Sequence, residues 1–67
     1  MSKTEWLFYL RKCHKINTLE FVIYRKAKYL SDYELMDFLS AADHRRAELV
    51  MGCLYDRIPK YVWHYVK

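Results

Sequence analysis

The chain has 67 residues, which is enough for one small hydrophobic core and too few for two domains. Hydrophobic residues make up 54% of it and it has only one glycine and one proline, which excludes a disordered tail or a loop-rich disulfide scaffold. The formal net charge is +4, but residues 1–28 carry seven Lys or Arg against two Asp or Glu, whereas residues 29–67 carry five against six. This asymmetry predicts one basic and one acidic surface, and therefore an anionic and a cationic kind of partner.

The location expected from the sequence is the cytoplasm. No apolar run approaches the roughly 20 residues that span a bilayer, and the charges among the first 12 residues lie too close to the apolar stretch for a secretory signal. Cys13 and Cys53 belong to no CxxC pair or zinc-type cluster, so we expect two reduced, buried thiols. No metal or cofactor is predicted.

The first two helices are expected at about residues 4–12 and 18–29. A small polar residue followed three positions later by Glu marks each start, because the two side chains can cap each other's free backbone N–H groups. These pairs are Ser2/Glu5, with Thr4 as an alternative cap, and Asn17/Glu20. The second helix shows a clear 3.6-residue period of apolar residues.

The third helix is expected at about residues 32–54, starting at the Ser31/Glu34 pair, with an apolar stripe that includes Leu49, Val50 and Cys53. A short fourth helix should follow Pro59, which suits a first helical turn because it lacks an N–H. The fold class is therefore all-α: one small four-helix domain over residues 1–67, with a long third helix and a short C-terminal helix.

Two acidic residues are predicted to meet across the hairpin of the second and third helices. Glu20 lies 11 residues before Ser31 and Asp43 lies 12 after it, so both should be roughly 16 to 18 Å from the turn. Asp43 continues a row that contains Leu39, beside two alanines that let another chain approach, and two acids at one level can share a partner's arginine. The alternative is that Asp43 pairs with Arg46 at i+3 and Glu20 only closes its capping box.

Two basic clusters lie near the C-terminal ends of the first two helices: Arg11, Lys12 and Lys15, then Arg25, Lys26 and Lys28. Cations there offset the helix macrodipoles, which explains their position but not their number. The aromatic residues are also more numerous than a small core encloses, and exposed aromatics favour protein association, unless the core is simply crowded. Those least able to turn inward are Phe21, Tyr24, Tyr29, Tyr33 and Tyr61.

Catalytic patterns are scarce, so the chain is not expected to be an enzyme. It lacks a Gly-rich phosphate loop, a G-x-S-x-G motif and an H-E-x-x-H motif. His44 and Glu48 at i, i+4 resemble half a metal site or a minimal hydrolase, but a third ligand is not apparent and a solvated pair is the better interpretation. A helix-turn-helix pattern is also missing, so direct reading of a DNA sequence is not expected.

Several motifs together resemble the Hha/YmoA/Cnu family of small enterobacterial modulators of gene expression. They are "SAADHRRAEL" and "LYDRIPKYVWHYV", preceded by "YLRKC", "NTLEFVI" and "LSDYEL", and they cover nearly the whole chain. Arg46 and the ending "VWHYV" look more like the Cnu branch, whereas "KCHKINTLE" looks like Hha and YmoA. Phe21 and Tyr24 depart from the charged residues expected there, which puts partner preference in doubt.

The resemblance implies a co-repressor, monomeric when alone, that binds the N-terminal dimerisation domain of the nucleoid-structuring protein H-NS or its paralogue StpA. It further implies stronger silencing of horizontally acquired, virulence or plasmid genes. The acidic positions matching Glu20 and Asp43 would contact a basic residue of that partner, with Leu39 beside them. Non-specific phosphate contacts would come from Arg11, Lys12, Lys15, Arg25 and Lys28. The rival interpretation is an autonomous small basic DNA-binding module.

Overall fold

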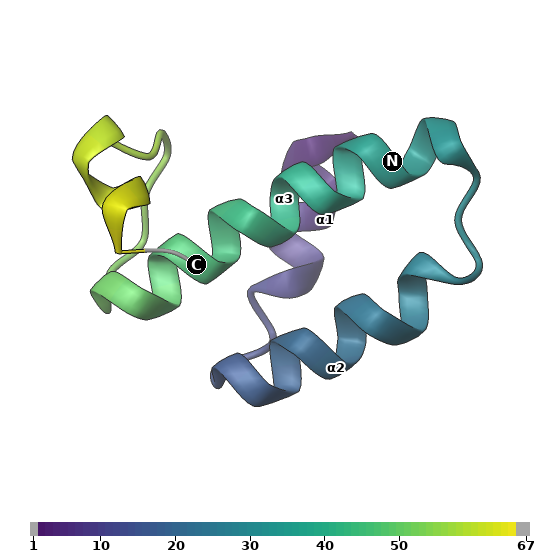
Figure 1. The fold of residues 1–67 in the computed structure, drawn as a ribbon, viewed down its shortest axis with the longest axis horizontal. Helices are drawn as coiled ribbons and strands as arrows, with labels where there is room; N and C mark the ends of the chain where they lie inside the picture. The colour runs from purple at the N-terminus through teal and green to yellow at the C-terminus, as the bar shows by residue number, and fades with distance from the viewer. Residues whose placement is uncertain (1, 66–67) are drawn as a thin grey trace.

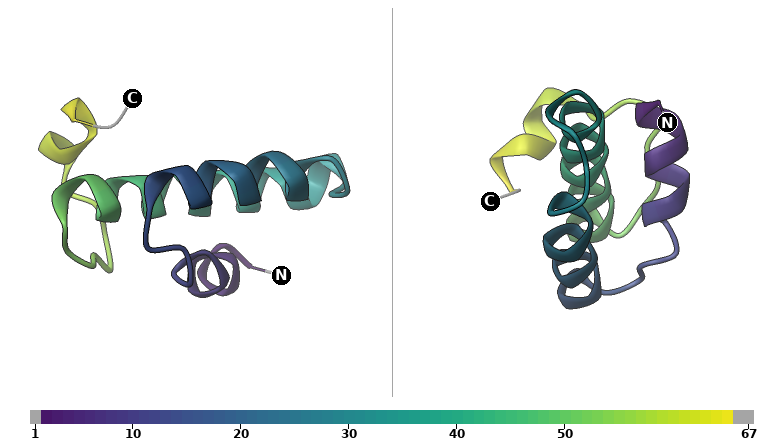
Figure 2. Two further views of the ribbon diagram at one scale, coloured as in Figure 1. Left: turned by 90° about the horizontal axis from the view of Figure 1, so that it is seen from below. Right: turned by 90° about the vertical axis from the view of Figure 1, so that its right-hand side faces the viewer.

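The computed structural model describes residues 2–65, and every regular element in this range is helical. Three α-helices and a 3₁₀ turn follow one another: α1 (Lys3–Leu10), α2 (Ile16–Ala27), α3 (Asp32–Met51) and η1 (Lys60–His64). α2 and α3 form an antiparallel hairpin, with α1 on one side of it and η1 on the other (Figures 1 and 2). The all-α prediction is therefore confirmed, whereas the fourth α-helix is a 3₁₀ turn.

Local capping explains the starts of two helices. The Ser2 hydroxyl accepts a hydrogen bond from the Glu5 N–H at 3.3 Å while the Ser2 N–H donates to Glu5 Oε1 at 3.0 Å, which confirms the first capping box. The Ser31 hydroxyl accepts from the Glu34 N–H in the same way, so α3 begins where the sequence predicts. Each such cap stabilises its helix by about 1 kcal/mol.

Several helix boundaries differ from the prediction, and α1 and α2 each end about two residues early, at Leu10 and Ala27. α2 begins at Ile16 after Lys15, which makes no side-chain cap, so the predicted Asn17/Glu20 capping box is wrong. α3 ends at Met51, before residue 54, because Gly52 adopts φ +71°, a left-handed conformation that ends a helix. The last helical segment, η1, follows Pro59 directly, as predicted, with Pro59 at its N-cap.

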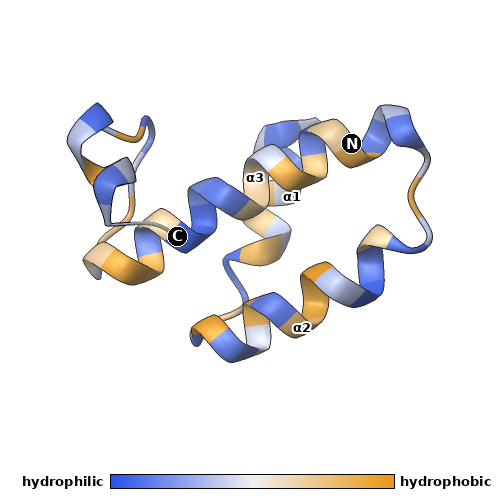
Figure 3. Ribbon diagram, in the orientation of Figure 1, coloured by the Kyte–Doolittle hydropathy of each residue, from blue (hydrophilic) through white to orange (hydrophobic). Residues whose placement is uncertain are grey.

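The apolar core lies where α1 crosses the hairpin. The Trp6 ring meets the Phe38 ring edge to face, with centroids 4.9 Å apart and planes at 77°. Burying a side chain of this size stabilises the fold by about 1.5–3 kcal/mol, and small residues on α3 let α1 pack closely. Figure 3 shows apolar and polar residues alternating around α2, as expected for a helix with one buried face. The buried apolar residues of the core are Trp6, Leu7, Leu10, Cys13, Leu19, Ile23, Phe38, Ala41 and Ala42.

The last turns of α3 bury charged side chains, and of the predicted apolar stripe only Leu49 packs against the core. Val50 and Cys53 are exposed, so the expectation of two buried thiols holds only for Cys13, although both cysteines are free. The buried positions in these turns are His44, Arg45, Ala47 and Glu48. Glu48 accepts hydrogen bonds from the guanidinium groups of Arg45 and Arg11. This part of the core is therefore ionic.

Glu48 also joins distant parts of the chain. Its carboxylate accepts from the Tyr55 N–H at 3.0 Å, and His44 Nε2 lies 2.7 Å from the Tyr55 carbonyl oxygen. Because both side chains are buried, the prediction of a solvated His44/Glu48 pair is wrong. Together these bonds hold the segment after α3 against α1 and α3.

Candidate functional site

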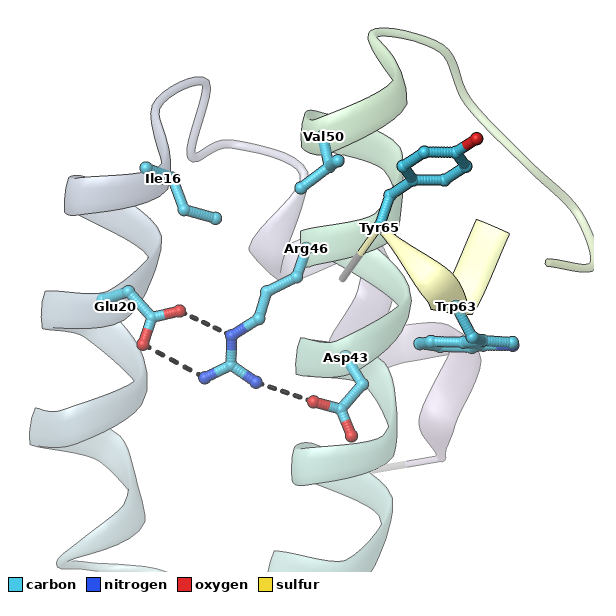
Figure 4. A pocket seen from close by; sticks show the side chains of 7 residues that line it. All are labelled: Ile16, Glu20, Asp43, Arg46, Val50, Trp63 and Tyr65. Atoms are coloured by element: carbon cyan, nitrogen blue, oxygen red, sulfur yellow. Dashed lines mark hydrogen bonds and ion pairs between the residues drawn. The ribbon is translucent and has the colours of Figure 1, made fainter. Parts of the chain in front are cut away.

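Glu20 of α2 and Asp43 of α3 lie level with each other across the hairpin, as their distances from the turn predict. Both carboxylates reach the guanidinium of one side chain, Arg46, which stands one turn after Asp43 (Figure 4). Arg46 Nη2 donates to Glu20 Oε2 at 3.1 Å and its Nε donates to Glu20 Oε1, while Nη1 donates to Asp43 Oδ1 at 2.6 Å. We call these three residues the acidic cluster.

The cation between the two acids comes from the chain itself. The alternative pairing of Asp43 with Arg46 is therefore present, whereas Glu20 bonds to Arg46 instead of closing a cap. The equal distances of Glu20 and Asp43 from the turn and the i+3 spacing of Asp43 and Arg46 are both visible in the sequence. Only the two features together predict that Arg46 also reaches Glu20. The sequence analysis paired Arg46 with Asp43 alone and missed its contact with Glu20.

The acidic cluster remains open to solvent on its carboxylate side. The side chains of Glu20 and Asp43 are 50% and 56% exposed, whereas that of Arg46 is 22% exposed. Two carboxylates and one guanidinium give the cluster a formal charge of −1. The hydrogen bonds from Arg46 hold the pKa of Glu20 below its usual value, so this acid is charged at neutral pH. A second cation can therefore approach without first removing Arg46.

A groove of about 810 Å³ contains the acidic cluster. Its apolar walls come from three elements, so a long side chain that reaches the acids would pack its methylene stem against them (Figure 4). Leu39 is not among the lining residues, although it is 40% exposed and lies one turn before Asp43 on α3. The apolar wall residues are Ile16, Val50, Trp63 and Tyr65.

The predicted phosphate-contacting residues divide into two groups. The Arg11 guanidinium donates hydrogen bonds to Glu48 and to the Tyr55 carbonyl oxygen, so it is not available for a phosphate. The other four are exposed, and three of them lie over aromatic rings: Lys12 over Tyr9, Arg25 over Phe21 and Lys28 over Tyr24. The four exposed cations are Lys12, Lys15, Arg25 and Lys28.

Within residues 2–65, no three His, Cys, Asp or Glu side chains are placed to hold a metal ion. In the same range, no helix combines the length and the apolar character that a membrane crossing requires.

Comparison with known proteins places the chain in a family. The model of the family described as haemolysin expression modulating protein matches residues 8–64. The chain belongs to this family. Members of the haemolysin expression modulating protein family are regulatory proteins by this description, and the all-helical fold agrees with the resemblance found in the sequence.

Several curated relatives carry the name "OriC-binding nucleoid-associated protein". Those from Escherichia coli O6:H1, Escherichia coli O157:H7 and Shigella flexneri serotype 5b are each 48% identical to it over 66 residues. The alignment covers 88% of this chain and 93% of each relative. The likeness thus extends over nearly the full length of both proteins.

Proposed function

We propose that the chain is a nucleoid-associated co-repressor that docks through the acidic cluster on the N-terminal dimerisation domain of H-NS or its paralogue StpA. The observation that carries the proposal is the pair of half-exposed carboxylates with a residual charge of −1 inside an apolar-walled groove. A protruding arginine of the partner would bind the free carboxylate faces. Its stem would pack against the wall beside Trp63.

Arg46 acts as an internal competitor in this proposal. It already occupies the space between the two acids, so the partner's cation must share them or displace it. Its pair with Glu20 is partly exposed, and exposed ion pairs contribute only about 0–1 kcal/mol, which keeps rearrangement inexpensive. Leu39, exposed near the cluster, would contact the partner at the edge of the groove.

The chain would contact DNA mainly as part of its complex with the partner. A partner bound to DNA would bring the exposed Lys12, Lys15, Arg25 and Lys28 close to phosphates, which adds affinity without sequence information. Arg11 is not included because its guanidinium is bound to Glu48. The nucleoid-associated name of the relatives supports the same location, the cytoplasmic nucleoid, and silencing of horizontally acquired, virulence or plasmid genes would be the outcome.

Affinity capture tests the choice of partner. The wild-type chain and Asp43→Asn are immobilised, exposed to an enterobacterial lysate treated with nuclease, and the bound proteins are identified by mass spectrometry. We expect wild type to retain H-NS or StpA and Asp43→Asn to lose it. Asp37→Asn is the matched control, because it removes the same charge from an exposed position of the same helix. Equal capture by all three proteins would contradict the proposal.

The rival function, autonomous DNA binding, rests on the four exposed cations. Mobility shifts with the purified chain alone, at about 150 mM salt, distinguish the two. The co-repressor proposal expects weak duplex binding that becomes tight when the partner is added, whereas tight duplex binding without the partner supports the rival.

A further inference from the structure

A second groove lies between α1 and α2, away from the acidic cluster. Its volume is about 320 Å³, and it combines three aromatic rings with two cations and no carboxylate. It borders α1, whereas the groove that contains the acidic cluster, which we call the docking groove, borders η1. These two elements lie on opposite sides of the hairpin (Figure 2). We call it the aromatic groove, and its lining residues are Tyr9, Phe21, Val22, Arg25, Lys26 and Tyr29.

The aromatic rings of this groove are available to a ligand. Phe21 is 59% exposed and Tyr29 is 84% exposed, so neither contributes much to the core. Their exposure is not needed for phosphate contacts, which require only cations, nor for the acidic cluster, which lies elsewhere. The docking proposal therefore leaves these rings unexplained.

Cations are held beside the rings. The Arg25 guanidinium carbon lies 5.5 Å from the Phe21 ring centroid, and Lys26 and Lys12 place their Nζ atoms 5.6 and 5.7 Å from that of Tyr9. Such cation–π contacts hold the charges over the faces of the Tyr9 and Phe21 rings and, within residues 2–65, leave the Tyr29 ring without one. A ligand that stacks on a ring would then have a positive group near its own negative charge.

We infer that the aromatic groove binds single-stranded nucleic acid. Unpaired bases offer flat faces that stack on aromatic side chains, and the phosphates between them match the surrounding cations. In a duplex the base faces are stacked on one another, so the exposed rings would add nothing to its binding. The all-positive charge of the lining selects this anionic ligand over an apolar protein surface.

Fluorescence anisotropy with the purified full chain tests this inference without any protein partner. The probes are a labelled oligo-dT strand of about 15 nucleotides and its duplex with oligo-dA, at about 150 mM salt. We expect the single strand to bind about fivefold or more tightly than the duplex. Because the assay contains no H-NS or StpA, its result is independent of the docking proposal.

Substitutions separate stacking from charge. Phe21→Leu and Tyr29→Leu should each weaken single-strand binding by about fivefold or more and leave duplex binding unchanged, whereas Arg25→Met should weaken both. Tyr33→Leu is the control, since Tyr33 is as exposed as Tyr29 but lies outside the groove. Circular dichroism confirms that each variant is folded.

Two outcomes would overturn the inference. One is duplex binding as tight as single-strand binding together with wild-type affinity of Phe21→Leu and Tyr29→Leu. The other is sedimentation showing concentration-dependent self-association that these two substitutions abolish, with no change in anisotropy. That second result would assign the groove to contacts between copies of the chain.

Discussion

Arg46 is the side chain on which the proposed docking depends most. It satisfies part of the hydrogen-bonding capacity of Glu20 and Asp43, and its own exposure is low. A partner's cation gains the remaining carboxylate faces but meets the repulsion of a like charge at close range. In the proposed docking, affinity would therefore be set by the balance between two acids and one competing guanidinium.

Replacing Arg46 by methionine should strengthen partner binding. Arg46→Met keeps a long side chain in the groove wall and changes the charge of the acidic cluster from −1 to −2. We expect the affinity for the H-NS dimerisation domain to rise by about two- to fivefold, as for an exposed ion pair. Surface plasmon resonance measures the change.

The control for Arg46→Met is Arg57→Met, which removes the same charge at an exposed position outside the docking groove. It should leave affinity unchanged. If Arg46→Met instead weakens binding while Arg57→Met does not, Arg46 assists the docking of the partner, and its assignment as a competitor is wrong.

At the scale of helices, the sequence correctly predicted the helix starts that depend on interactions between neighbouring residues. The caps at Ser2 and Ser31 involve residues three positions apart, so their pattern is visible in the sequence. The Asn17/Glu20 pattern misled because Glu20 bonds to Arg46, 26 residues away, and α2 starts earlier. The Glu20 side chain therefore makes a tertiary contact with Arg46 and does not form the local capping bond that its spacing from Asn17 predicts.

The end of α3 was also placed too late, and its final turns were assigned the wrong buried face. An apolar stripe was expected there, but Arg45 and Glu48 are buried because Arg11 and the Tyr55 backbone reach them from distant parts of the chain. Helical periodicity identifies apolar faces and does not reveal charges whose partners are remote in sequence. The acidic cluster was only half predicted for the same reason.

Gly52 should contribute to the stability of the fold only through its backbone conformation. At φ +71° an alanine is strained, whereas nothing lies within 4 Å of an added Cβ atom. Gly52→Ala should therefore lower the free energy of unfolding by about 1 kcal/mol, and Gly52→Asn by less, because asparagine tolerates this region better. Urea denaturation followed by circular dichroism gives both values, and equal stability of Gly52→Ala and wild type would contradict the helix-end assignment.

At the scale of the whole molecule, the Glu48 carboxylate joins three segments: α1 through Arg11, α3 through Arg45, and the following loop through Tyr55. Burial raises the pKa of Glu48, but the hydrogen bonds from Arg11, the Tyr55 N–H and Arg45 outweigh it and lower the pKa overall. The charged form is thus the one that the fold stabilises.

Acid should weaken the fold through this group. Because the folded-state pKa of Glu48 lies below its unfolded value of about 4.3, its contribution is complete above that pH and is lost as the pH falls through the folded-state pKa. The pKa values of Glu5 and Glu20 are lowered as well, so they act in the same direction. We expect the free energy of unfolding to be nearly constant from about pH 7 to 5 and to decline below about pH 4.5.

Urea denaturation across this pH range measures the decline, and Glu48→Gln tests its source. The variant should lose on the order of 3 kcal/mol at neutral pH, because it leaves the buried guanidinium of Arg45 and the partly buried one of Arg11 without their charge partner. Its remaining stability should depend less on pH. Wild-type stability that is unchanged down to about pH 3 would show that Glu48 does not hold the three segments together.

The positions of the two grooves suit a protein that connects two partners. The docking groove lies beside η1 and the aromatic groove beside α1, on opposite sides of the α2–α3 hairpin (Figures 1 and 2). The two proposed contacts, with a nucleoid protein and with a nucleic acid, would therefore use different sides of the hairpin. The central claim is that the first of these contacts uses the carboxylates of Glu20 and Asp43.

Isothermal titration calorimetry with the purified H-NS dimerisation domain tests that claim most directly. Asp43→Asn should weaken binding by at least about thirtyfold, equivalent to ~2 kcal/mol, because the partner's cation would be desolvated without its acid. Glu20→Gln should also weaken binding, and Asp37→Asn should not, with helical circular dichroism retained in all three. Wild-type affinity in both Asp43→Asn and Glu20→Gln would contradict the account.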